Sequence, residues 1–173
     1  GAGLYRNVHV VTTEKIHVPV WGTQITTPYV KDEYASVCLR TTILNAEKTE
    51  LTVVTDIIDA DGQVVSTKTN KGVINHGQPF TQNFIVERPK LWSPETPVLY
   101  KAVSKIYSGD TLLDTYSTRF GIRTIEYIAD KGFYLNGKRR KFQGVCNHHD
   151  LGPLGAAINV AALRHQLTLL KEM

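Results

Sequence analysis

Residues 132–155 read GFYLNGKRRKFQGVCNHHDLGPLG, and the organisation of the chain follows from this stretch. Asn136-Gly137 stands between two short apolar runs, and Asn-Gly accepts the positive φ angles of a two-residue hairpin turn. The second arm continues into residues 142–146, which predict a short strand. A polar cluster, a glycine-rich loop and a helical pattern follow in that order. This order is typical of a parallel α/β unit, in which ligands bind beyond the carboxyl ends of the strands.

The polar cluster Asn147-His148-His149-Asp150 also has two simpler interpretations. It can be a solvated loop, since runs of polar residues are common at protein surfaces. It can also be a metal site, but adjacent histidines on an extended chain point to opposite faces. No second Cys or His group lies nearby in sequence, so we expect neither a metal nor a cofactor here.

The length and charge of the chain limit its size class and its partners. A chain of 173 residues forms one domain, or one domain and a piece of another. The net charge is +4, but the basic residues are scattered and only residues 138–141 form a run, which we interpret as a solvated turn. We therefore expect no nucleic-acid partner. No apolar run approaches the roughly 20 residues of a membrane span, so we expect no membrane partner.

Upstream of the hairpin, strand-like segments recur about every ten residues between turn residues. Residues 34–45 alternate well and place Ala35, Val37, Leu39, Thr41 and Ile43 on one face. The pattern predicts an all-β fold, an immunoglobulin-like β-sandwich, although the Cys–Trp–Cys spacing of antibody domains is absent. The predicted strands are 23–27, 34–45, 51–59, 63–69, 73–74, 80–87, 98–107 and 112–121, and residues 4–13 are also β-rich.

The sequence supports three further predictions, which concern a tryptophan, the two cysteines and the C-terminal segment. Trp92 lies in a proline-rich loop, where we expect it to plug the end of the sandwich or a domain seam rather than to stack on a sugar. Cys38 and Cys146 fall in segments that we assign to different domains, which predicts two free thiols. Residues 159–173 predict an amphipathic helix with Asn159 as its N-cap.

Four strings carry a resemblance to a known family. They are GLYR at 3–6, LWSPETPVLY at 91–100, FGIRTIE at 120–126, and the opening stretch, which fits FYLNGKxxxFxGVxNHHDxGxLG. In this order they resemble glycoside hydrolase family 2, and most closely its bacterial β-galactosidases. The resemblance implies that the sandwich is followed by a C-terminal hairpin and one β/α unit of a truncated (β/α)8 barrel. The implied domains are 1–13, the end of a jelly-roll linker strand; 14–126, the sandwich; and 127–173, the start of the catalytic barrel.

The resemblance also implies an activity for the parent protein. It is a retaining glycoside hydrolase of terminal β-galactosides, in which the sandwich acts as a scaffold between domains. The retaining mechanism uses two carboxylates, and in this family the first follows an asparagine. No Asn-Glu pair occurs in the sequence, so we expect no catalytic residue here and no activity from this chain alone. His148 matches a histidine that contacts the sugar, and Asn147 and Asp150 lie close enough to support it as substrate-binding residues.

Two alternatives to the β-galactosidase hypothesis stay open. The parent can be a β-glucuronidase or β-mannosidase of the same family, or the chain can be a stand-alone carbohydrate-binding or adhesion sandwich. Against the stand-alone module, the C-terminal helix would expose its apolar stripe without a packing partner, which favours self-association. The partner implied by the resemblance is a carbohydrate. The source is bacterial by resemblance, and the cytoplasm and the periplasm both stay open.

Overall fold

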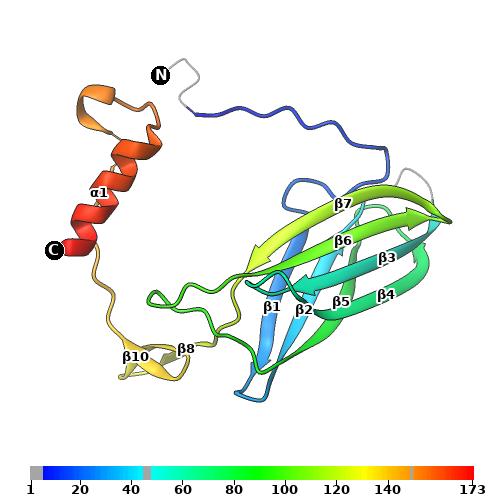
Figure 1. The fold of residues 1–173 in the computed structure, drawn as a ribbon, viewed down its shortest axis with the longest axis horizontal. Helices are drawn as coiled ribbons and strands as arrows, with labels where there is room; N and C mark the ends of the chain where they lie inside the picture. Colours follow the sequence, from blue (N-terminus) through cyan, green and yellow to red (C-terminus); the bar gives the residue numbers. More distant parts are fainter. Residues whose placement is uncertain (1–5, 45–47, 149) are drawn as a thin grey trace. The chain divides into compact units, whose positions relative to one another are not determined.

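Seven antiparallel strands build two facing sheets within Thr13–Lys141 (Figure 1). The computed structural model describes residues 6–44, 48–148 and 150–173. One sheet has the order β1-β2-β5 and the other β4-β3-β6-β7. The immunoglobulin-like sandwich predicted from the turn spacing is therefore confirmed. The strands are β1 (Thr23–Val30), β2 (Tyr34–Thr42), β3 (Thr49–Ile58), β4 (Val64–Ile74), β5 (Pro79–Glu87), β6 (Tyr100–Ser108) and β7 (Thr111–Phe120).

The inward face of β2, continued by Ile43 just after the strand ends, carries the residues that the alternation predicts. Ala35, Val37, Leu39, Thr41 and Ile43 are all fully buried. Successive side chains of a strand point to opposite faces, so one face of this period-2 pattern lies against the opposite sheet. Residues 73–74 differ from the prediction, because they continue β4 rather than form a strand of their own.

A buried polar layer lies in the core and joins the two sheets. Gln82 of β5 is 1% exposed, and its Oε1 accepts a hydrogen bond from the hydroxyl of Thr55 in β3 at 2.7 Å. The same hydroxyl lies 2.8 Å from the hydroxyl of Ser104 in β6. Gln82 Nε2 also lies 3.2 Å from Oδ1 of Asn70 in β4. Because buried polar groups cost free energy when unpaired, this layer fixes which strands face one another.

A small third sheet follows the sandwich and belongs to the same compact unit. It consists of β8 (Ile125–Ile128), β9 (Gly132–Leu135) and β10 (Lys138–Arg140). Asn136 and Gly137 connect β9 to β10 with φ angles of 50° and 71°. The hairpin turn predicted from Asn-Gly is confirmed, with positive φ at both central residues as a type I′ turn requires.

The second compact unit joins the chain up to Thr12 with Phe142–Met173. Its regular elements are the short 3-10 helix η1 (Gly152–Leu154) and the helix α1 (Val160–Glu172). Asn159 caps α1 as predicted, since its side chain accepts a hydrogen bond from the backbone N–H of Ala162 at 3.0 Å. None of the residues of α1 is buried. No helix in the described part of the chain is long and apolar enough to cross a membrane.

Two β predictions in this second unit are wrong. Residues 142–146 form no strand, and neither do residues 6–12 of the β-rich N-terminal run. Both segments have strand-like composition, but a strand is stable only when a neighbour satisfies its backbone N–H and C=O groups. The family-derived boundaries at 13/14 and 126/127 stay predictions, while the compact unit observed here spans Thr13–Lys141.

Candidate functional site

Residues 150–155 form a loop that closes through local hydrogen bonds. The carboxylate of Asp150 accepts a bond from the backbone N–H of Gly152 at 2.9 Å. The N–H of Leu151 donates to the carbonyl oxygen of Gly155 at 2.9 Å, and Leu151 is buried. Gly152 and Gly155 have φ angles of 62° and 57°, which glycine adopts without strain. The sequence GPLG therefore makes a compact turn between the polar cluster and α1.

The three predicted substrate-binding residues lie on or beside this turn. Asn147, His148 and Asp150 are exposed, and His149 lies outside the described residues. One carboxylate oxygen of Asp150 accepts a hydrogen bond within the turn. No group of three or more His, Cys, Asp or Glu side chains in the described ranges is placed to hold a metal ion. The loop can offer amide, imidazole and carboxylate hydrogen-bonding groups to a polar ligand.

A second set of contacts joins the hairpin to the end of the sandwich. Asn136 Oδ1 accepts a hydrogen bond from the N–H of Thr124 at 3.0 Å, and Asn136 Nδ2 donates to the carbonyl oxygen of Trp92 at 3.0 Å. The N–H of Asn136 returns a bond to the carbonyl oxygen of Thr124 at 3.1 Å. The backbone N–H of Trp92 donates to the carbonyl oxygen of Ile122 at 2.8 Å. One asparagine side chain thus ties together the proline-rich loop, the segment after β7 and the hairpin.

An ion pair fixes the other end of the hairpin to the same loop. The guanidinium of Arg140 donates two hydrogen bonds to the carboxylate of Glu95, at 2.6 and 2.8 Å. The bond from Arg140 is the main reason that the pKa of Glu95 is lowered to about 2. Bidentate pairs of this kind add geometric specificity, because two parallel bonds fix the relative orientation of both groups.

Trp92 occupies the packing position that its sequence context predicts. A Cβ atom added to Gly121 would lie 2.7 Å from the Cβ of Trp92, so the indole side chain packs directly on the glycine backbone. The guanidinium of Arg123 lies 5.2 Å from the centre of a Trp92 ring. We call the set Trp92, Glu95, Gly121, Asn136 and Arg140 the junction cluster. A groove of about 700 Å³ beside it is lined in part by Ile25, Leu99 and Phe120.

Sequence reasoning missed most of the junction cluster. It identified Asn136 only as a turn residue and assigned no partner to Glu95 or Arg140. The sequence did contain one indication of the cluster, because its residues fall in three of the strings that carry the family resemblance, at 91–100, 120–126 and 132–155. Those strings are far apart in sequence, and the structure brings them to one end of the sandwich.

The fold and its junction can now be compared with known proteins. The family model described as glycosyl hydrolases family 2 matches residues 16–123, which is more than half of the chain. This chain belongs to glycosyl hydrolase family 2. The match covers β1 to β7, which is the complete sandwich. The family suggested by the four strings is therefore confirmed.

Two relatives show how far the similarity extends. β-Galactosidase BoGH2A of Bacteroides ovatus is 44% identical over 177 residues, which cover 100% of this chain and 21% of that protein. A β-glucuronidase of Formosa agariphila is 32% identical and matches 82% of this chain and 16% of its own length. The chain therefore spans only about a fifth of the length of the first of these relatives.

Two solved structures show the same fold. A β-glycosidase from Bacteroides vulgatus superposes with a TM-score of 0.89 at 30% identity, over 99% of this chain and 22% of that one. A family 2 member from Bacteroides cellulosilyticus gives a TM-score of 0.86 at 33% identity, over 92% of this chain and 21% of that one. At these identities and scores the likeness covers both the fold and the family.

Proposed function

We propose that this chain is the sandwich and the start of the catalytic domain of a retaining family 2 glycosidase that hydrolyses terminal β-galactosides. The observation that carries this proposal is the 44% identity to a β-galactosidase over the whole chain. The HHD and LGPLG strings of residues 148–155 support the same sugar. In the parent protein the chain acts as a scaffold, and the glutamates of the retaining pair are supplied by another part of the polypeptide.

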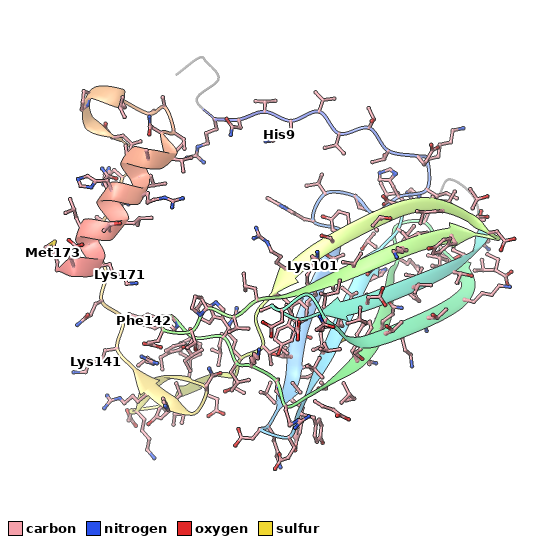
Figure 2. The ribbon with its side chains drawn as sticks, in the orientation of Figure 1. His9, Lys101, Lys141, Phe142, Lys171 and Met173 are labelled. Atoms are coloured by element: carbon pink, nitrogen blue, oxygen red, sulfur yellow. The ribbon has the colours of Figure 1, made fainter. Side chains whose placement is uncertain are left out.

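The structure suggests how such a scaffold works. The junction cluster fixes the hairpin to one end of the sandwich through the Asn136 bonds and the Arg140–Glu95 pair. The chain leaves this fixed hairpin at Lys141, just before the segment that carries Asn147, His148 and Asp150 (Figure 2). A rigid exit point reduces the number of directions that the following segment can take. We propose that this constraint helps to place the substrate-binding loop in the assembled enzyme.

The test begins with the native polypeptide. An antibody raised against this chain should capture, from the source cells, a protein several-fold heavier than 19.3 kDa. That protein should hydrolyse 4-nitrophenyl β-galactoside, and the pure 173-residue chain should not. A captured protein of about the mass of this chain, or turnover by the pure chain above a mock purification, would contradict the proposal.

Substitutions in the native polypeptide then test the loop. His148→Ala should lower kcat/KM for the aryl galactoside at least tenfold, because a lost hydrogen bond to the transition state is worth about 1.4 kcal/mol or more. His165→Ala is the matched control, since His165 is an exposed histidine of α1. Equal activity of the two variants would contradict the proposal that His148 binds the substrate.

A β-glucuronidase is the second candidate, because the Formosa agariphila relative carries that name. The two activities are separated by comparing kcat/KM of the native polypeptide for aryl β-galactoside and aryl β-glucuronide. A ratio in favour of the glucuronide would overturn the choice of sugar and leave the scaffold role intact. The free chain is also expected to self-associate through α1, which gel filtration at rising protein concentration would detect.

A further inference from the structure

Trp21 is held in a conformation that tryptophan rarely adopts and that buries almost none of its side chain. It is the third residue of a turn in which the N–H of Gly22 donates to the carbonyl oxygen of Pro19 at 2.8 Å. Its φ angle is 59°, a position that glycine normally fills in such turns. The side chain is 91% exposed. The sandwich therefore gains little stability from this indole, and strained residues of this kind gather at functional sites.

Two open grooves meet at the exposed indole. The first, of about 610 Å³, is lined by Trp21, Leu99, Thr118 and Arg119, with Thr23, Tyr116 and Ser117. The second, of about 220 Å³, is lined by Trp21, Gln24, Arg40 and Thr42, with Gly22, Thr23 and Pro79. Hydroxyl, amide and guanidinium groups thus border the ring on both sides. An apolar platform with a polar border suits a ligand that has C–H faces and many hydroxyl groups.

The charged side chains that line the two grooves all have the same sign. Arg40 and Arg119 are exposed and border different grooves. Within the described ranges, no carboxylate lines either groove and neither guanidinium forms an ion pair. A guanidinium group presents paired N–H donors that match a carboxylate or sulfate. The surface is therefore complementary to an anionic ligand.

We propose that Trp21, Arg40 and Arg119 form a binding site for an acidic glycan, a sugar chain that carries carboxylate or sulfate groups. One pyranose ring packs its C–H face on the indole, and acidic groups of the chain bind the two guanidinium groups. A protein partner fits less well, because hydroxyl, amide and guanidinium groups interrupt the apolar surface around Trp21. The site lies on the sandwich and is separate in sequence from the His148 loop, so the inference goes beyond the proposed hydrolysis.

The test uses binding by the 173-residue chain, without any hydrolysis. The probes are tetragalacturonate and its fully methyl-esterified form, which share a skeleton and differ in charge. In ¹⁵N-labelled protein, tetragalacturonate should shift the indole N–H signal of Trp21 and leave that of Trp92 in place. The ester should bind at least tenfold more weakly, and raising NaCl from 50 to 500 mM should weaken binding of the acid. Failure of the acid to shift the Trp21 signal, or equal binding of the two forms, would overturn the proposal.

Three variants separate binding from folding. Trp21→Gly should lower affinity at least tenfold while Tm stays the same or rises, because glycine accepts the φ of 59° without strain. Arg40→Gln and Arg119→Gln should each weaken binding several-fold, and Arg139→Gln, an exposed arginine of β10, should not. A clear fall of Tm in Trp21→Gly would show that the indole packs against protein instead. Equal losses in all three arginine variants would show attraction to net charge rather than a site, and would also overturn the proposal.

Discussion

The carboxyl group of Glu95 links the stability of the junction to pH. Its pKa is lowered from an ordinary value of 4.5 to about 2, mainly by the hydrogen bond from Arg140. A carboxyl group whose pKa is lower in the folded state stabilises the fold fully above its unfolded pKa, and loses this contribution as pH falls through the folded value. We therefore expect the stabilisation by this pair to be present above about pH 5 and to disappear toward pH 2.

The measurement is Tm by circular dichroism from pH 2 to 7, for the wild-type chain and Arg140→Met. The difference in Tm between the two should shrink as the pH falls, since the wild type alone has the pair to lose. Arg139→Met is the matched control, because Arg139 is the neighbouring exposed arginine. A difference that stays constant with pH would show that Arg140 acts through packing and not through Glu95.

Gly121 tests the close packing of Trp92. Gly121→Ala places a methyl group 2.7 Å from the Cβ of Trp92, so the loop or β7 has to move. Overpacking of this kind costs about 1–3 kcal/mol, which urea unfolding would measure. Gly72→Ala is the control, because a Cβ there meets no atom within 4 Å and its φ is not positive. If both variants lost the same stability, the contact with Trp92 would not be the cause.

Single-residue prediction from the sequence succeeded where one segment contained the whole cause. The inward face of β2 follows from alternation, and the turn at Asn136-Gly137 follows from the φ angles that these residues tolerate. The bonds of Asn136 to Thr124 and Trp92 could not be predicted in this way. They depend on how segments far apart in sequence meet, and a local pattern carries no information about that.

At the scale of elements, the buried polar layer sets the pairing of the two sheets. Thr55→Val removes the hydroxyl that bonds Gln82 and Ser104, and leaves Gln82 Oε1 and Ser104 without this partner in the core. A buried group left without its partner costs about 1–3 kcal/mol, which we expect as the loss of unfolding free energy in urea.

A double variant distinguishes the polar bond from lost packing. Thr55→Val combined with Gln82→Leu should lose less unfolding free energy than the sum of the two single losses, because the Gln82 Oε1 that Thr55→Val leaves unpaired is then absent. Thr52→Val is the control, a half-buried threonine of the same strand. Strictly additive losses in the double variant would show that the two side chains do not stabilise one another.

The same scale explains the two strands that the sequence predicted and the structure lacks. Residues 6–12 and 142–146 have the composition of strands but form none here. Strand propensity describes how a side chain fits a pleated surface, and it has no effect until a neighbouring strand supplies hydrogen bonds. The helix α1 forms because its hydrogen bonds lie within the segment and Asn159 caps it.

At the scale of the whole molecule, the end of the compact unit at Lys141 predicts where a protease cleaves the chain first. Residues 141–148 are exposed and have no regular structure. Brief trypsin treatment should therefore cleave after Lys141 before it cleaves after Lys101, which lies in the paired strand β6 (Figure 2). Mass spectrometry should find a resistant fragment that ends at Lys141. Early cleavage at Lys101 would contradict the assignment of the sandwich and hairpin as one compact unit.

The turn at Asn136-Gly137 also limits the chemical lifetime of the junction. Asparagine followed by glycine is prone to deamidation, because the small glycine lets its backbone nitrogen attack the side-chain amide. Deamidation would replace Nδ2, which now donates to the carbonyl oxygen of Trp92 at 3.0 Å, with a negatively charged oxygen. Two acceptors would then face each other where a hydrogen bond had been. The residue that joins three segments is thus a site at which the ageing protein can lose that connection without any change in its gene.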